Sequence, residues 1–472
     1  MTTVVDDMTA PRVIPRGLQP SEHSVLLVAG DACAATAAVA VALWLWSIPA
    51  GYPFSTDFVT GHAWWFVAAV FWLAAASIPA APSYVAFSLR RTLAVLARGA
   101  AVLLIAYGAL YFSLPRLLPR LVVLYFIWEA TLLTLAWRLV FVTVFSRQRF
   151  RQRAIIVGSG RGAALALSTI RLHRARQVDV VGFVPEQGPV EPSLDVPRID
   201  GSRLLETAAE RGASELVLAL SRAPAEGLLK TLLVCQEKGA QVVRVQTLVE
   251  QVLQRVPVDL LEPDWLMTDL ADATRIREAS WVAKRALDIT GAIVGLLALA
   301  LLTPAIAIAI WLDSGSPLFY RQQRVGRGGV LFNVVKFRTM ARDAERPGEA
   351  KWADRDDPRT TRVGRWLRRM RLDELPQFAN VLRGEMSLVG PRPERLEFIA
   401  RLQEAIPYYR ARLMVPPGLT GWAQVNLPYG DSVEAARAKL EYDLYYVKHR
   451  SMLFDLAILL RTVGIVARLG GR

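Results

Sequence analysis

Residues 289–312 read ITGAIVGLLALALLTPAIAIAIWL, an uninterrupted apolar run of 24 residues. A straight helix of that length would be about 36 Å long, enough to cross a hydrocarbon core of about 30 Å. Pro304 divides the run into arms of 15 and 8 residues, because proline removes a backbone donor and clashes with the preceding turn. Lys284 and Arg285 precede the run and further arginines follow it, which disfavours a crossing. We therefore predict a re-entrant helix at about 286–313, with a kinked spanning helix as the alternative.

Four more apolar stretches lie upstream, at about 24–48, 62–80, 92–114 and 119–145. Each is near the ~20 residues that a spanning helix needs, so we predict a four-helix transmembrane region over 1–150. The positively charged residues that flank these stretches are unequally distributed between the two sides of the membrane. Eight lie on the side that holds both ends of the block, and two, Arg116 and Arg120, lie on the other side. The positive-inside rule then places both ends of the block in the cytoplasm.

Composition agrees with a membrane protein that has an anionic partner. Of 472 residues, 53% are hydrophobic and 21% charged, which excludes a disordered or wholly soluble chain. The net charge is +14, and residues 314–472 hold 28 Lys and Arg against 17 Asp and Glu. Beside membrane segments, such a basic region favours phospholipid headgroups or phosphorylated substrates, and we expect no nucleic acid. Two cysteines and four scattered histidines exclude a disulfide framework and a histidine zinc site, so oxygen atoms must hold any metal.

From Ala154 onward, short apolar strands alternate with amphipathic segments, which predicts a parallel, Rossmann-like α/β domain over 151–262. Its first turn, GSGRGA at 158–163, fits the relaxed GxGxxG/A form that brings backbone N–H groups close to a pyrophosphate. An acidic residue after the second strand is needed to bind a ribose, and the one nearby is Glu186, behind Pro185. A scaffold domain without a ligand is the alternative. No cofactor-binding residue is assigned here, and whether this domain binds a nucleotide is left open.

Two patterns in the last third suggest a phosphate site. Residues 333–340, NVVKFRTM, predict a strand with Lys336 and Arg338 on one face, which could grip a diphosphate or simply be solvated. Further along, Asp373 and Glu374 stand just before Pro376, a residue favoured in a first helical turn. An isolated acid pair there would compensate the helix dipole. The arginines upstream would keep these acids ionised and attract a phosphorylated substrate; they are Arg362, Arg365, Arg368, Arg369 and Arg371.

Adjacent carboxylates can divide the work of phosphoryl transfer. One attacks phosphorus and is transiently phosphorylated, while the other holds Mg²⁺ against the phosphate oxygens. A glycosidase pair is disfavoured, because its carboxyl groups must face each other across about 5–9 Å. Arg392 lies between two prolines in VGPRP at 389–393 and adds a phosphate-binding cation on a rigid stretch of backbone.

Six motifs occur in one order across about 190 residues: KRALD (284–288), KFRTM (336–340), LDELPQ (372–377), MSLVGPRP (386–393), PGLTGWAQV (417–425) and KLEYDLYYVK (439–448). In these residues the chain resembles the bacterial sugar transferases, also called polyprenyl-phosphate glycosylphosphotransferases or monotopic phosphoglycosyl transferases. With the preceding membrane and Rossmann-like regions it is similar to the large form. The NLPYGDSVEAA run at 426–436 resembles the exopolysaccharide-initiating branch.

The resemblance implies a mixed α/β catalytic domain at 279–472. It implies transfer of a sugar 1-phosphate from a UDP-sugar to undecaprenyl phosphate, with release of UMP, at the cytoplasmic face of a bacterial inner membrane and among its lipids. Asp373 would be the nucleophile and Glu374 the ligand of Mg²⁺. The residues that would contact or support the phosphates are Lys336, Arg338, Arg368, Arg392 and Gln377. The sugar, the polymer and a homo-oligomeric state are left open.

One residue departs from the family pattern: Pro416 stands where Lys or Arg usually precedes PGLTG. If that cation binds phosphate, Arg412 or Arg410 must replace it. Two other functions are alternatives. A membrane-tethered nucleotide-sugar dehydratase is supported only by the glycine turn and lacks a YxxxK pair. A non-catalytic assembly protein predicts loss of the acid pair or its cations, and both are present.

Overall fold

The computed structural model describes residues 20–77, 89–113, 120–145, 151–175, 177–186, 194–220, 224–261, 278–341, 344, 357–428, 430 and 432–467. The chain divides into two compact units, Met1–Leu253 and Gln254–Arg472. The predicted limits 1–150, 151–262 and 279–472 stay a prediction.

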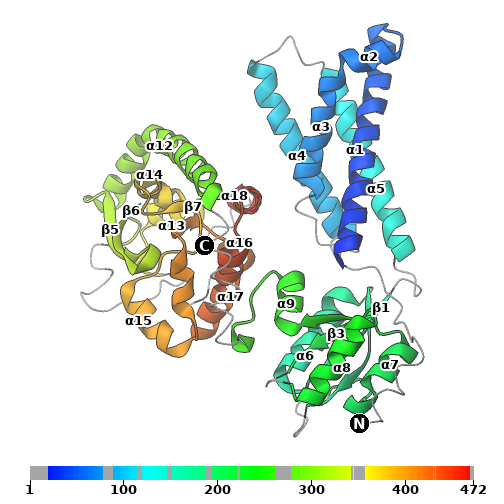
Figure 1. Ribbon diagram of the computed structural model, residues 1–472. Coiled ribbons are helices and arrows are strands. Elements are labelled where there is room, and N and C mark those ends of the chain that lie inside the picture. Colours follow the sequence, from blue (N-terminus) through cyan, green and yellow to red (C-terminus); the bar gives the residue numbers. More distant parts are fainter. Residues whose placement is uncertain are drawn as a thin grey trace. The chain divides into compact units, whose positions relative to one another are not determined.

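The first unit begins with a group of long helices, coloured blue to cyan in Figure 1. All four apolar stretches named from the sequence are helical where the structure describes them. The elements are α1 (Pro20–Ala50), α2 (Thr56–Gly61), η2 (Ala63–Phe66), α3 (Val67–Trp72), η3 (Leu73–Ser77), α4 (Leu89–Ser113) and α5 (Arg120–Phe145). Helix α1 packs along α5, with Gly30 facing the Trp137 ring, and the buried Asp31 and Arg138 join the two helices through an ion pair of 2.6 Å.

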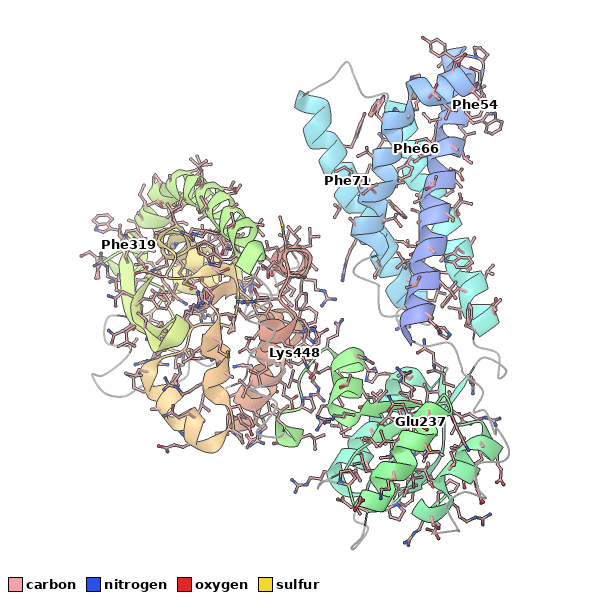
Figure 2. All side chains as sticks on the ribbon, in the orientation of Figure 1. Phe54, Phe66, Phe71, Glu237, Phe319 and Lys448 are labelled. Atoms are coloured by element: carbon pink, nitrogen blue, oxygen red, sulfur yellow. The ribbon has the colours of Figure 1, made fainter. Side chains whose placement is uncertain are left out.

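Large apolar side chains remain on the outside of these helices. Figure 2 labels Phe71 on α3, which is 59% exposed, and Phe54 before α2. Among the described residues, three helices are long and apolar enough to cross a membrane: Val25–Ala50, Leu121–Phe145 and Trp281–Ser314. Ala63–Ala75 and Thr92–Leu104 are shorter apolar helices. The protein therefore has membrane-type helices in both units, whereas four crossings in the first unit stay a prediction.

The α/β part of the first unit confirms the predicted parallel sheet. Its strands are β1 (Gln152–Val157), β2 (Val178–Val184), β3 (Glu215–Leu218) and β4 (Gln241–Arg244), all parallel and in the order β2-β1-β3-β4. Its helices and short turns are α6 (Gly160–Thr169), η7 (Ile170–Arg174), η8 (Gly201–Arg203), α7 (Leu204–Arg211), α8 (Glu226–Glu237) and α9 (Val245–Leu253). Glu237, labelled in Figure 2, is the last residue of α8. The glycine turn lies where the sequence puts it: it follows β1 directly and runs into the first turn of α6.

The second unit contains α12 and a small mixed α/β body. Its elements are η9 (Val258–Leu260), α12 (Glu278–Ser314), β5 (Phe319–Val325), η11 (Arg327–Gly329), β6 (Leu331–Phe337), α13 (Arg362–Arg369), η12 (Leu372–Gln377), α14 (Phe378–Arg383), β7 (Ser387–Val389), α15 (Leu396–Ala405), η13 (Tyr409–Met414), β8 (Gly418–Thr420), α16 (Trp422–Asn426), α17 (Val433–His449) and α18 (Met452–Ala467). Strands β5 and β6 form an antiparallel pair, in which Phe319 stacks on Phe337, and β7 and β8 form a parallel pair. Figure 2 labels Phe319 at the start of β5 and Lys448 near the end of α17.

Helix α12 is continuous through Pro304 and is drawn as a curved helix in Figure 1. On its inner side, Gly291 faces Leu388 and Gly295 faces the Phe378 ring, so a β-carbon at either glycine would collide with the body of the unit. Beyond the proline, Ile306 and Ile310 pack in a buried cluster with α13 and Phe337. Its outer side is apolar and exposed, as at Leu297, Leu301 and Leu312. One face of α12 is therefore covered by protein both before and after Pro304. The other face is an exposed apolar surface, as is typical of a helix in contact with an apolar environment.

Candidate active site

The acid pair lies in the first turn of η12, as the sequence predicts. Arg371, just before it, adopts a left-handed backbone with φ of 55°, a conformation that costs a residue other than glycine about 1–3 kcal/mol. This residue separates α13 from η12. Asp373 is buried, at 8% exposed, and Pro376 and Gln377 of the same turn are buried too. The local sequence thus places two neighbouring carboxylates in a protected turn.

Glu374 is surrounded by cations from separate parts of the chain. Its Oε1 accepts hydrogen bonds from Arg392 Nη2 at 2.7 Å and from Lys336 Nζ at 3.2 Å. Its Oε2 lies 3.5 Å from Arg371 Nη1. Lys336 belongs to β6 and Arg392 to the segment after β7. These contacts cluster positive charge around one carboxylate.

The two acids respond in opposite directions. Burial raises the pKa of Asp373, and the neighbouring Glu374 charge adds to that effect. Burial alone would also raise the pKa of Glu374, but Arg392, Lys336 and Arg371 outweigh it and lower that pKa well below its usual range. Arg368 and Arg392 favour ionisation of Asp373, as expected of the arginines, but burial and the Glu374 charge outweigh them and leave its pKa raised. Burial also lowers the pKa of Lys336 to about 8, against the attraction of Glu374.

Lys336 and Arg338 do not act as a pair on one strand face. Strand β6 ends at Phe337, so the predicted alternation stops before Arg338. The Arg338 guanidinium donates to the Ser314 and Gly315 carbonyl oxygens, at 2.8 and 2.5 Å. It therefore fastens the end of α12, and its predicted contact with a phosphate stays a prediction.

Arg368 of α13 and Gln377 of η12 both lie near the acid pair. Gly364 lets α13 approach Thr339 closely, and Arg368 then donates from Nε to Thr339 Oγ1 at 3.0 Å. Arg368 also contributes to the electrostatics of Asp373. Gln377 is 4% exposed, and its Nε2 has no hydrogen-bond partner among the described residues. A buried amide donor without a partner is costly, so Gln377 is suited to donate to a bound ligand.

The part of the chain that carries this site is similar to known proteins. Residues 279–469 match the family described as bacterial sugar transferase. A UDP-glucose:undecaprenyl-phosphate glucose-1-phosphate transferase of Caulobacter vibrioides is 43% identical over 209 residues, 44% of this chain and 78% of that protein. The chain belongs to the bacterial sugar transferase family. The resemblance identified from the six motifs is thereby confirmed.

Two other relatives extend the comparison of this bacterial sugar transferase. A UDP-N-acetylgalactosamine-undecaprenyl-phosphate N-acetylgalactosaminephosphotransferase of Aeromonas hydrophila is 43% identical over 180 residues, 38% of this chain and 42% of that protein. An undecaprenyl-phosphate glucose phosphotransferase of Komagataeibacter xylinus is 35% identical over 325 residues, 67% of this chain and 59% of that protein. The chain thus spans about half the length of these two relatives.

The structure of this sugar transferase adds residues that the sequence patterns missed or assigned differently. Arg371 stands in the sequence only as one of five upstream arginines, yet it directly contacts Glu374. By contrast, Arg362, Arg365 and Arg369 lie on the exposed side of α13. Arg412, considered as a substitute phosphate ligand, is buried in an ion pair with Asp443. Spacing could not reveal the Arg412–Asp443 pair, because its partners are 31 residues apart. Arg371 lies three residues before Glu374, a spacing at which the contact could have been predicted.

Proposed function

We propose that this protein transfers a sugar 1-phosphate from a UDP-sugar to undecaprenyl phosphate and releases UMP. The observation that carries the proposal is the buried acid pair with opposite pKa shifts inside a group of cations. Two carboxylates face four cations: Lys336, Arg368, Arg371 and Arg392. The excess positive charge suits a diphosphate, whose negative charge would balance it. The names of the relatives support the same substrates.

In this reaction Asp373 is the nucleophile. A carboxylate oxygen of Asp373 bonds to the phosphorus that carries the sugar, and the bond from that phosphorus to the bridging oxygen breaks. UMP leaves with the electron pair. A phosphate oxygen of the lipid then attacks the same phosphorus, and the aspartyl–phosphorus bond breaks, which regenerates the carboxylate. The raised pKa of Asp373 makes its ionised form a stronger nucleophile than an exposed aspartate.

Glu374 is the proposed ligand of Mg²⁺. The donor set fits this ion in part, because Mg²⁺ is commonly bound by one or two carboxylates together with substrate phosphates. Within the described ranges, no group of three or more His, Cys, Asp or Glu residues is placed to hold a metal. Phosphate oxygens would therefore complete the coordination. When bound, the ion would neutralise charge on those oxygens.

The re-entrant course of α12 belongs to the same proposal. Near its start, Arg285 donates to the Val381 and Leu382 carbonyl oxygens. Near its end, Asp313 accepts from the Val363 N–H at 3.0 Å. A straight helix of 37 residues would be about 55 Å long, so a crossing would carry its ends to opposite sides of a bilayer. Attachment of both ends to one body supports a helix that enters and leaves the same leaflet.

These features support a membrane setting for the reaction. We place four crossings in the first unit and the catalytic unit on the cytoplasmic face of the bacterial inner membrane, where a nucleotide sugar and a lipid phosphate can meet. The exposed side of α13 carries Arg362, Arg365, Trp366 and Arg369, which suits contact with membrane lipids. The reaction would be the first membrane step in making an exopolysaccharide, capsule or O-antigen, and a homo-oligomer stays open to test.

A trapping experiment tests the covalent step. The full-length protein is incubated with UDP-glucose or UDP-galactose and Mg²⁺, without lipid acceptor, and digested for mass spectrometry. We expect a hexose-phosphate adduct on Asp373 and UMP in the supernatant. UMP release that requires the lipid acceptor, with no adduct under any UDP-sugar of a panel, would contradict the two-step course.

The topology has a separate test. In a background with Cys33 and Cys235 replaced by alanine, Gly328→Cys introduces a thiol just after β5. Gly328 itself has a φ of 67°, so Arg327→Cys serves as a second variant without that strain. A membrane-impermeant maleimide added to the periplasmic side should leave both unlabelled until the membrane is opened. Labelling from the periplasmic side in intact cells would overturn the re-entrant helix.

A further inference from the structure

Arg412 and Asp443 form a buried ion pair close to the candidate site. Arg412 lies in η13 and Asp443 in α17, with side chains 4% and 2% exposed. Both Nε and Nη2 of Arg412 donate to Asp443 Oδ2, at 3.0 and 2.8 Å. Nη1 donates to the Tyr409 hydroxyl at 3.0 Å. A buried ion pair is expensive to desolvate and often stabilises no more than apolar residues would, so packing alone is a weak reason for it.

The same guanidinium reaches the segment that carries Arg392. Arg412 Nη2 also donates to the Arg392 carbonyl oxygen, at 3.0 Å. The Arg392 side chain in turn donates to Glu374. A continuous series of hydrogen bonds therefore runs from Asp443 on α17 through Arg412 and Arg392 to the acid pair.

Three consecutive carbonyl oxygens of this segment are held, each by a different donor. The Gly418 N–H donates to Pro391 O at 2.9 Å, Arg412 to Arg392 O, and Arg324 Nη1 to Pro393 O at 3.2 Å. The two prolines have no N–H and a fixed φ, so carbonyl contacts are the main hydrogen bonds that can fix this backbone. Of the three donors, only Arg412 is locked by a buried carboxylate of its own.

We propose that Arg412, held by Asp443, is a positioning residue that fixes the Arg392 backbone so that the Arg392 guanidinium meets Glu374 and the substrate phosphate. This inference rests on the proposed function for its catalytic consequence. In this proposal Arg412 does not replace the phosphate-binding cation that the family usually has at position 416, because its N–H groups donate to other residues of the protein. A shift of about 1 Å in a binding group can cost about 100-fold in rate, which sets the scale of the effect.

The test is a pair of double-mutant cycles in the full-length protein. Arg412→Lys keeps the charge but loses the forked donors, and Asp443→Asn keeps the shape but loses the charge. We expect either change to lower kcat/KM for UMP release about 10- to 100-fold. In an Arg392→Ala background, the same changes should cost less than about two-fold, because the group they position is gone. Equal losses in both backgrounds, or normal turnover of Arg412→Lys, would overturn the proposal.

A matched control lies on the same helix. Glu441 of α17 is two residues from Asp443 in the sequence and pairs with Arg255 at 3.0 Å instead of with a residue of the candidate site. Glu441→Gln should change turnover by less than about two-fold. If Arg412→Lys and Asp443→Asn do not fold, Tyr409→Phe removes only the hydroxyl that accepts from Arg412, and a few-fold loss that vanishes with Arg392→Ala is expected.

Hydrogen exchange separates failure of this inference from failure of the proposed function. In Arg412→Lys, peptides that contain the Arg392 and Glu394 amides should exchange faster than in the wild type, whereas Glu441→Gln should leave them unchanged. Unchanged exchange in Arg412→Lys would refute the positioning role even if the enzyme is active. Faster exchange in a protein that never releases UMP would keep the positioning role and refute the proposed function.

Discussion

The turn after β1 and the acid pair in η12 both carry local patterns associated with phosphate binding, but their surroundings differ. In the turn, Gly158 has a φ of 137° and donates from its N–H to Val184 O. A β-carbon there would collide with the carbonyl oxygen of Ala219, the residue after β3. Packing and backbone conformation thus account for this glycine without any ligand.

The acid pair has no such local explanation. Lys336, Arg371 and Arg392 reach Glu374 from three segments of the chain and remain partly exposed, so the positive charge around one carboxylate is accessible to an anion. Glycine spacing can thus follow from close packing, whereas converging cations are suited to bind the proposed phosphate. Changes at η12 should therefore affect turnover and changes at the turn should affect folding.

The largest effect is expected from Asp373→Asn. The amide cannot attack phosphorus, so UMP release should be abolished while the melting temperature changes little. Turnover is measured with a UDP-sugar, Mg²⁺ and a polyprenyl phosphate. Asp357→Asn, which removes a carboxylate paired with Arg359, is the matched control and should retain most activity. Normal turnover of Asp373→Asn would remove Asp373 from the mechanism.

Glu374→Gln should lower kcat about 100-fold, or about 3 kcal/mol, because the charge that meets Lys336 and Arg392 and that would hold the proposed Mg²⁺ is lost. The concentration of Mg²⁺ needed for half-maximal turnover should also rise. The measurement is a Mg²⁺ titration after treatment with a chelator. An unchanged Mg²⁺ response in an impaired variant would show that Glu374 does not hold the metal.

The pKa of Lys336 predicts how the activity should change with pH. Its pKa of about 8 means that the free enzyme loses this positive charge as the pH rises through 8, so binding of an anionic substrate should weaken above that value. We expect kcat/KM to fall up to about ten-fold between pH 8 and pH 9.5. In Lys336→Arg the side chain stays charged, and the alkaline decline should disappear. A decline of equal size in that variant would assign it to another group.

Gly158→Ala should have the smallest effect on turnover. The added β-carbon and the φ of 137° should destabilise the α/β part by about 2–3 kcal/mol, while the folded enzyme releases UMP at the normal rate. Gly227→Ala in α8 is the control, because nothing lies within 4 Å of the place its β-carbon would take and no strain is expected. Loss of turnover in well-folded Gly158→Ala would give the glycine turn a catalytic role and break the contrast with η12.

Sequence patterns were most informative where neighbours along the chain decide the structure. Hydrophobic periodicity located the parallel strands, and the LDELPQ motif placed Asp373 and Glu374 in one helical turn. The same reasoning misjudged Arg338, because a two-residue alternation holds only while the strand continues. It also could not tell Arg368, which turns inward to Thr339, from the exposed Arg365 of the same helix.

The sequence by itself determined the family, the apolar helices, the α/β class and the identity of the acid pair, because these depend on composition, periodicity and motifs. Tertiary structure decided which cations reach Glu374 and how the pKa values of the two acids diverge. It also decided that Arg412 donates a hydrogen bond to the Arg392 carbonyl oxygen. The physical reason is that electrostatic and hydrogen-bonding energies depend on distance and burial in space. Residues 336, 374, 392, 412 and 443 meet only when the chain is folded.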